Sequence, residues 1–296
     1  MAIATARVPR DISRETQARG SRAMRPISAA ASVDLRGVQV VLTDMDDTLT
    51  FDGKLSAETY DALERLEAAG VRVIPVTAAP AGWCDQMVRM WPVTAVIGEN
   101  GGFCFSREGT SVTRRFWSTP DMLEAAQSRL ADMARTIMKK HPELTLSDDQ
   151  PFRRTSLALA RPEDRATARA VLREFEARGA SATANSLWVI AWFGGYNKVT
   201  AVRKFLPAIT GLDIDLDRDR LLFVGDSAND APMFAHMPKS VGVSTVTRHL
   251  ADIPHPPTWI TKGAGGAGFV EVADAILANR PDAPAKALPA RSAESH

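Results

Sequence analysis

The sequence contains little cysteine, little net charge and no long apolar segment. Cys84 and Cys104 are the only cysteines among 296 residues, which is too few for a disulfide framework, and their spacing does not fit a zinc site. The formal net charge is +1, so no overall charge attracts the chain to nucleic acid or to anionic lipid. No apolar run approaches the roughly 18 residues of a membrane span. We therefore expect a cytoplasmic location, with no nucleic-acid and no membrane partner.

The two ends of the chain differ in composition from its middle. Residues 1–34 are rich in Arg, Ser and Ala, and no apolar segment follows their basic residues, which argues against a secretory signal. We expect a disordered tail rather than a targeting segment or an upstream start before Met24, because such a composition cannot bury a core. Residues 281–296, rich in Ala and Pro, are expected to be a second disordered tail.

Short apolar strands alternate with helices in two separate parts of the chain. Strands are expected at 38–42, 71–76 and 95–97, with a helix beginning after Ser56 and another through Trp83. The same pattern resumes at Asn197, with strands at 221–224 and 240–243 and a last helix from Phe269. This alternation with short links predicts one parallel α/β sheet, built from residues 35–105 and 195–280.

The segment between these two parts has a different pattern. A long helix is expected from Pro120, followed by strands near 144–146, 156–160 and 187–193 and a helix over 162–178. We expect residues 106–194 to form an inserted α+β domain with its own antiparallel sheet.

Polar residues suited to phosphate chemistry follow strand ends or begin helices. Because the carboxyl ends of parallel strands meet along one crevice, these side chains are expected to converge there. They are Asp44, Asp46, Asp47 and Thr48 after the first strand, Thr77 after the second, Lys198 at a helix start, and Asp226, Asn229 and Asp230 after a later strand.

Attack on a phosphoryl group needs a nucleophile in line with the leaving oxygen and positive charge for the other oxygens. Asp44 is ionised near neutral pH but is repelled by phosphate, and Mg²⁺ between Asp44 and Asp226 would remove that repulsion. Lys198 and the Thr77 hydroxyl can hold the remaining oxygens. If the segment is extended, Asp46 shares the face of Asp44 and can protonate the leaving oxygen, whereas Asp47 faces away.

The order Asp-x-Asp-x-Thr, Thr, Lys and Gly-Asp-x-x-x-Asp resembles the haloacid dehalogenase superfamily. Residues 43–49, the Gly-Glu-Asn-Gly at 98–101, and 225–234 are similar to subfamily IIB, which includes Cof-type sugar phosphatases, sucrose-phosphate phosphatase and mannosyl-3-phosphoglycerate phosphatase. The resemblance covers about residues 38–278. It implies an α/β fold with a Rossmann-like parallel-sheet core and an inserted α+β cap domain that determines substrate specificity.

Carried over residue by residue, the resemblance implies that Asp44 is the nucleophile and Asp46 the acid/base. It implies that Mg²⁺ is held by Asp44, Asp226 and the backbone carbonyl of Asp46. Asp230 belongs to the same metal site, where it holds a metal-bound water or orients Lys198. The residues it implies for phosphate are Thr77, the backbone amide of Ala78, Lys198 and Asn229. Asn100 either contacts the substrate or only suits the turn before Gly101. The chain departs from Cof-type members at 77–80, where Thr-Ala-Ala-Pro replaces the common Thr-Gly-Arg. The missing Arg removes a substrate contact, so this motif does not by itself imply sugar specificity.

We therefore expect a Mg²⁺-dependent phosphatase that hydrolyses a small phosphorylated metabolite, such as a sugar phosphate, through an aspartyl-phosphate. A phosphomutase of the same superfamily uses the same aspartates and remains an alternative, as does a non-catalytic phosphosugar-binding module. A signalling receiver is disfavoured by the order of its acids and by its shorter chain. The sequence indicates neither the substrate nor the oligomeric state.

Several other residues are given no chemical role. We expect four tryptophans to lie in the core rather than to form a platform for a sugar: Trp83, Trp91, Trp188 and Trp192. We expect Arg153 and Arg154 to lie on a solvated edge rather than to meet an anionic part of the substrate. The five histidines show no metal-ligand spacing.

Overall fold

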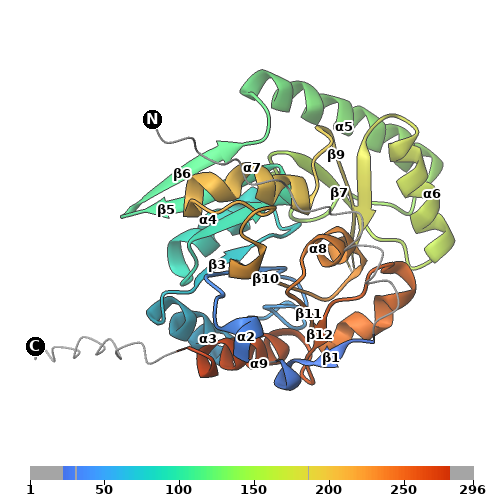
Figure 1. Cartoon of the computed structure of the whole chain (residues 1–296). Helices are drawn as coiled ribbons and strands as arrows, with labels where there is room; N and C mark the ends of the chain where they lie inside the picture. Colours follow the sequence, from blue (N-terminus) through green and yellow to red (C-terminus); the bar gives the residue numbers. More distant parts are fainter. Residues whose placement is uncertain (1–22, 31, 186, 281–296) are drawn as a thin grey trace, which may run out of the picture.

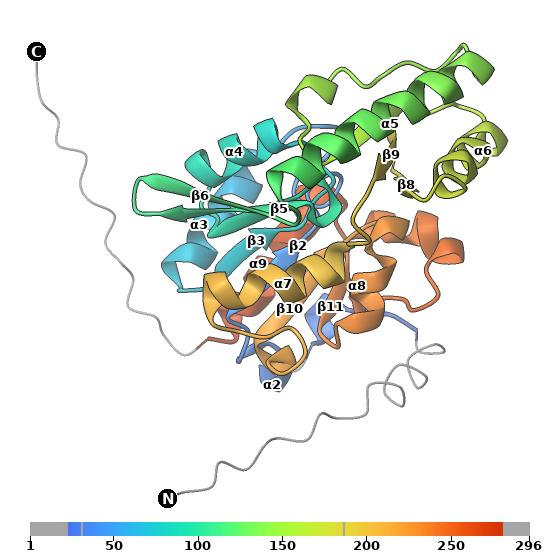
Figure 2. The ribbon, with the colours of Figure 1, turned by 90° about the horizontal axis from the view of Figure 1, so that it is seen from above.

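The computed structural model describes residues 23–30, 32–185 and 187–280. A parallel sheet with helices on both faces forms the main body, and a group of two helices on an antiparallel sheet lies at one end of it (Figures 1 and 2). The fold is therefore α/β, as expected, with an inserted antiparallel unit. Within the described residues, no helix is both long enough and apolar enough to cross a membrane.

The main sheet has six strands in the order β1-β12-β11-β10-β2-β3, and all of its pairs are parallel. Every residue of β2 is buried, as expected for a strand with neighbours on both sides and helices on both faces. Thr43 of β2 lies opposite Val224 of β10, which sets the two strand ends side by side. The strands are β1 Arg25–Pro26, β2 Val40–Thr43, β3 Arg72–Pro75, β10 Leu221–Gly225, β11 Ser240–Gly242 and β12 Trp259–Ile260.

Two apolar clusters lie on the two faces of this sheet, because successive side chains of a strand point to opposite faces. Val41 belongs to the cluster that contains the apolar residues of α3, α4 and α9, and Val40 and Leu42 belong to the cluster that contains those of α7 and α8. The helices of the core are α2 Ser32–Leu35, α3 Ala57–Ala68, α4 Ala81–Met90, α7 Lys198–Thr210, α8 Ala231–His236 and α9 Gly265–Ala278.

A β-hairpin that the sequence did not indicate extends the core. Strand β4 Ala95–Gly98 pairs with β5 Phe103–Glu108, which pairs with β6 Ser111–Phe116, all antiparallel. A single parallel bridge between Val76 and Ile97 joins this sheet to the end of β3. The division expected between residues 105 and 106 falls inside β5, so we propose that the inserted domain begins after Phe116.

The inserted unit has two helices packed on one face of a three-stranded antiparallel sheet of order β7-β9-β8. Its core contains Leu130 and Ile137 from α5, Phe175 from α6 and Val189 from β9. The prediction of a strand at 144–146 is wrong, because only an isolated bridge joins Leu146 to Leu159. Its elements are α5 Pro120–Lys140, β7 Ser156–Ala160, α6 Arg165–Glu176, β8 Ser181–Ala184 and β9 Trp188–Trp192.

Short 3-10 helices connect many of these elements. They are η1 Ile27–Ala29, η2 Glu99–Gly101, η3 Gln150–Phe152, η4 Arg218–Arg220, η5 Ala228–Asp230 and η6 Ser244–Asp252. Four of them, η2, η3, η5 and η6, carry or flank residues of the candidate site.

Part of the expected N-terminal tail, residues 1–34, is folded against the core. Arg25 and Pro26 pair with β12, the Arg25 guanidinium lies 5.6 Å from the centroid of the Trp259 ring, and Ile27 is buried. The average composition of residues 1–34 does not predict this contact, because the contact depends on only one buried isoleucine and one short strand pair. The rest of the expected tail, residues 1–22, and the expected C-terminal tail 281–296 lie outside the described residues.

Candidate active site

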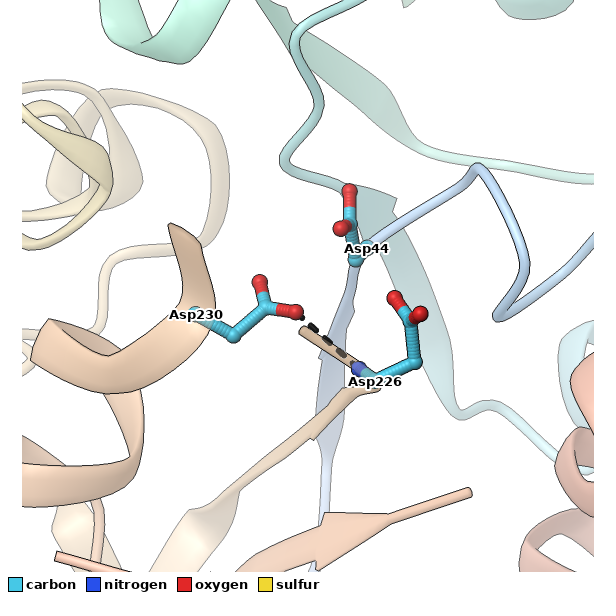
Figure 3. Close-up of side chains that lie close together, drawn as sticks. All are labelled: Asp44, Asp226 and Asp230. Atoms are coloured by element: carbon cyan, nitrogen blue, oxygen red, sulfur yellow. Dashed lines mark hydrogen bonds between the residues drawn. The ribbon is translucent and has the colours of Figure 1, made fainter. Parts of the chain in front are cut away.

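Three buried aspartates meet at the carboxyl ends of two neighbouring strands. Asp44 directly follows β2, Asp226 directly follows β10, and Asp230 ends η5 just beyond. One carboxylate oxygen from each lies within 4.8 Å of the others, and Figure 3 shows the three side chains around a common space. Convergence of Asp44 and Asp226 follows from the parallel pairing of β2 with β10.

Lys198 is the single cation in direct contact with this cluster among the described residues. Its Nζ lies 2.7 Å from Oδ1 of Asp230 and 3.0 Å from Oδ1 of Asp44. Lys198 is the first residue of α7, and a capping box between Asn197 and Thr200 fixes where that helix begins. The lysine is therefore held at the site by both its helix position and its two partners.

Asp230 is fixed by backbone as well as by Lys198. Its Oδ2 accepts hydrogen bonds from the amides of Asp226, at 3.0 Å, and Ser227, at 3.2 Å (dashed line to Asp226 in Figure 3). Because both oxygens of Asp230 already accept hydrogen bonds, its first effect is to orient Lys198 and the turn after β10.

The charges of the cluster do not balance. Three carboxylates face one ammonium, and burial together with repulsion from Asp230 raises the pKa of Asp44 to about 8 and that of Asp226 to about 9. A bound cation would reverse these shifts. Clustered carboxylate oxygens are the donor set that a hard cation such as Mg²⁺ prefers, so the residues present fit this metal.

The loop after Asp44 is a turn and not an extended segment. The amides of Thr48, Leu49 and Thr50 all donate to the carbonyl of Met45, and Asp47 has a φ of 54°. Asp46 and Asp47 consequently line the same cavity as Asp44, and the expectation that Asp47 faces away is wrong. Burial and the neighbouring charge of Asp47 raise the pKa of Asp46 to about 6.

The other predicted phosphate residues surround this point from three segments. Thr77 is fully buried after β3, and its carbonyl accepts a hydrogen bond from Asn100, whose φ is 59°. The Asn100 side-chain nitrogen is buried and has no hydrogen-bond partner within the described part of the chain. Ala78 and Asn229 line the cavity together with Asp44, Asp46 and Asp226. Four further residues are buried next to these segments: Thr77, Asn100, Lys198 and Asp230.

A cavity of about 460 Å³ lies between the core and the inserted domain, directly over the aspartates. Asp44, Asp46 and Asp226 form its floor, and α6, β8 and η6 supply most of its walls. The walls include four arginines that the sequence analysis did not identify: Arg161, Arg165, Arg169 and Arg248. In the sequence, only the spacing of four between Arg165 and Arg169 could have indicated this wall, because it places both side chains on one side of a helix.

A second, apolar cavity of about 300 Å³ shares Asp46, Ala78 and Asn185 with the first. Its lining includes Trp83, Trp91 and Trp188. Trp83 is 44% exposed, so the expectation that it lies in the core is wrong, whereas Trp91 and Trp188 are partly buried and pack against core clusters. Trp192 is buried, in agreement with the expectation.

A buried glutamate joins the inserted domain to the core. The Glu99 carboxylate accepts hydrogen bonds from the amide of Ala81 in the core and from residues 154–156 of the inserted domain: the amides of Arg154 and Thr155 and the hydroxyls of Thr155 and Ser156, at 2.7–3.1 Å. This is the chemical role of the Glu in the 98–101 motif that the sequence alone did not reveal.

Arg153 adds a second connection at the same place. It forms a buried ion pair with Asp149 at 2.7 Å and donates a hydrogen bond to the carbonyl of Ala78 at 3.1 Å. The expected position on a solvated edge is therefore wrong for Arg153. Arg153 and Glu99 together hold the inserted domain against the core segment that lines the cavities.

Glu99→Gln is expected to destabilise the protein although it conserves side-chain shape. An amide group offers one acceptor oxygen in place of two, so at least one of the buried backbone amides now bonded to Glu99 faces an NH₂ group. Leaving a buried donor unsatisfied costs about 1–3 kcal/mol. Chemical denaturation should show this loss in the free energy of unfolding, whereas Glu64→Gln, at an exposed position on α3, should change it by no more than about 0.5 kcal/mol. Equal effects of the two variants would contradict the role of Glu99.

Comparison with known proteins agrees with this arrangement. Residues 41–119 match a family of haloacid dehalogenase-like hydrolases. No significant match was found among curated protein sequences.

Solved structures resemble the chain over most of its length. A protein of Thermoplasma acidophilum is 20% identical with a TM-score of 0.64, covering 81% of this chain and 98% of its own. A haloacid dehalogenase-like hydrolase of Bacteroides thetaiotaomicron is 15% identical with a TM-score of 0.60, covering 81% and 99%. A sugar phosphatase of subclass IIB is 13% identical with a TM-score of 0.59, covering 81% and 98%. At these identities the likeness establishes the fold.

Proposed function

The chain resembles the haloacid dehalogenase-like hydrolases in its fold and, over residues 41–119, in its sequence, and from this premise we propose that it is a Mg²⁺-dependent phosphatase. Its substrate would be a small phosphomonoester, hydrolysed through an aspartyl-phosphate at Asp44. The observation that carries the proposal is the convergence of Asp44, Asp226 and Lys198 under a cavity large enough for a small metabolite.

Asp44 and Asp226 would hold Mg²⁺ together with the backbone carbonyl of Asp46, and Asp230 would complete the site by orienting Lys198. Bound Mg²⁺ would supply the positive charge that lets an anionic carboxylate approach an anionic phosphate. Lys198 and the Thr77 hydroxyl would bind phosphate oxygens. The Ala78 amide is suited to the same task, because within the described residues it donates to no acceptor. Asn229 and Asn100 would add side-chain contacts to the substrate.

Two proton-coupled steps then follow from the positions of Asp44 and Asp46. In the first, a carboxylate oxygen of Asp44 attacks phosphorus, the bond from phosphorus to the leaving oxygen breaks, and Asp46 gives its proton to that oxygen. In the second, Asp46 takes a proton from water, whose oxygen attacks the acyl-phosphate and releases inorganic phosphate and the Asp44 carboxylate. A pKa of about 6 suits a group that must give and take a proton near neutral pH.

The test is phosphate release from p-nitrophenyl phosphate, first in EDTA and then with excess Mg²⁺. We expect no turnover in the chelator, full recovery with Mg²⁺, and no need for a bisphosphate activator. Full activity in EDTA would exclude the metal-dependent mechanism, and a strict need for an activator would identify a phosphomutase instead.

Mg²⁺ should also stabilise the folded protein, which can be measured without any substrate. At a concentration ten times its dissociation constant, a ligand stabilises by about 1.4 kcal/mol, which raises the melting temperature of a domain of this size by roughly 2–4 °C. Asp226→Asn should remove this increase. The variant should be at least as stable as the wild type without metal, because it relieves the repulsion that raises the pKa of Asp226. An unchanged increase in Asp226→Asn would exclude Asp226 as a ligand.

A further inference from the structure

Four arginines line the cavity above the aspartates and come from three segments of the chain. Arg161 follows β7, Arg165 and Arg169 lie on α6, and Arg248 lies on η6. Asp252 is the one acidic residue on this part of the lining. The cavity therefore has an acidic floor and a basic upper wall.

The local fold of α6 turns two of these arginines toward the cavity. Asp164 caps the helix by accepting hydrogen bonds from the amides of Ala166 and Thr167, at 3.2 and 2.8 Å. Val171 and Phe175 pack into the core of the inserted domain, and Arg165, Arg169 and Leu172, spaced by four and three residues, lie on the side that lines the cavity.

These arginines have little internal compensation for their charge. Arg161 donates a hydrogen bond to the carbonyl of Asn185 at 2.7 Å. For Arg165, Arg169 and Arg248, no ion pair or side-chain hydrogen bond is present within the described residues. Arg161 and Arg165 are distant in sequence from Arg248, yet all three line this one cavity.

Like charges gathered around one cavity repel each other, and two arginines four residues apart slightly destabilise their helix. An anion bound in the cavity would offset both the repulsion among the arginines and the destabilisation of the helix. Guanidinium groups bind carboxylate and phosphate oxygens in pairs of parallel hydrogen bonds, which gives such a site direction as well as charge.

We propose that the substrate carries a second anionic group, a carboxylate or another phosphate, which these arginines bind while the phosphate to be removed lies at Asp44. The inference rests on the proposed phosphatase function. The arginine-lined cavity is preferred over the apolar one because its lining includes Asp44 and Asp226, whereas neither of these two aspartates lines the apolar cavity. The substrate class is thus a phosphorylated acid or a bisphosphate, and not a neutral sugar phosphate.

Matched substrate pairs test this inference on the full-length protein with Mg²⁺. Sorbitol 6-phosphate and 6-phosphogluconate share an open chain and differ in a terminal carboxylate, as do glycerol 3-phosphate and 3-phosphoglycerate. Fructose 6-phosphate and fructose 1,6-bisphosphate differ in a second phosphate. We expect kcat/KM to be at least about tenfold higher for the more anionic member of one pair, which corresponds to about 1.4 kcal/mol. The pair that responds identifies the second group as a carboxylate or a phosphate.

Variants then show whether the arginines cause the preference. Arg165→Gln combined with Arg169→Gln should lower the ratio of kcat/KM between the two members about tenfold, and replacement of both by Lys should lower it less. Arg173→Gln removes one arginine charge from an exposed position of α6 that does not line the cavity, so it should leave the ratio unchanged. The inference would be overturned if the wild type preferred the member of each pair that lacks the second anionic group. It would also be overturned if the kcat/KM ratio were equal in the double variant and in Arg173→Gln.

The proposed function can fail separately. If p-nitrophenyl phosphate is not hydrolysed, the phosphatase assignment is wrong, and the second anion is then tested by calorimetric titration with 6-phosphogluconate and sorbitol 6-phosphate. Tighter binding of the carboxylate that weakens in the double variant supports the arginine site, and equal binding of the two compounds excludes a carboxylate. The same titration with fructose 6-phosphate and fructose 1,6-bisphosphate tests for a second phosphate: tighter binding of the bisphosphate supports it, and equal binding excludes it.

Discussion

Asp44→Asn is expected to abolish phosphatase turnover and to leave the protein folded. The amide has the shape of the carboxylate but cannot attack phosphorus to form an acyl-phosphate. Loss of a covalent nucleophile typically lowers kcat by about 10⁴-fold or more, which leaves only the contribution of binding and of the other groups. The fold should tolerate the change, because a neutral side chain relieves the burial and the Asp230 repulsion that raise the pKa of Asp44.

Initial rates with p-nitrophenyl phosphate and Mg²⁺ check this expectation, with circular dichroism as the control for folding. Rapid acid quenching with a labelled phosphomonoester should trap phosphoenzyme in the wild type and none in the variant. A variant that keeps more than a trace of the wild-type rate, or that still forms labelled protein, would show that the nucleophile is another residue.

Asp46→Asn is expected to have the second largest effect, and the size should depend on the leaving group. General acid catalysis contributes about 10²- to 10⁴-fold and matters most when the leaving oxygen is a poor one. Hydrolysis of an alkyl phosphate should therefore fall by about that factor. With p-nitrophenyl phosphate the first step needs less protonation, so it should suffer less, and phosphoenzyme should accumulate because water activation is still impaired.

Asp47 provides the matched control, because it lines the same cavity and differs from Asp46 by one position. Its charge contributes to the raised pKa of Asp46 through space. Asp47→Asn should change the rates with either substrate only modestly, since no proton transfer is assigned to it. If Asp47→Asn is the more damaging variant, or if Asp46→Asn still hydrolyses alkyl phosphates at the wild-type rate, Asp46 is not the acid/base.

Much of the core could be predicted from the sequence, because its signals are local. The apolar run of β2, the N-cap at Ser56 and the start of α7 at Lys198 each depend on residues within a few positions of each other. Polar residues directly after two apolar strands predicted that Asp44 and Asp226 meet, and the parallel pairing of β2 with β10 places them side by side.

Local signals also have limits inside the same motif. The sequence placed Asp46 and Asp47 on opposite faces because it assumed an extended chain. The structure closes residues 45–50 into a turn held by three amides on one carbonyl, that of Met45. Such a turn depends on the packing around it, and the alternation of faces ends where the strand ends.

The sequence by itself determined which residues carry the proposed phosphate chemistry, since those residues have fixed positions relative to strands and helix starts. Only the tertiary structure decided what else surrounds the substrate. Arg161 and Arg248 line one cavity because α6, β8 and η6 surround the space above the aspartates. Glu99 receives hydrogen bonds from residues 154–156 because the inserted domain packs against the core there. Contacts between segments distant in sequence are set by the packing of whole elements, and no periodicity or spacing along one chain encodes them.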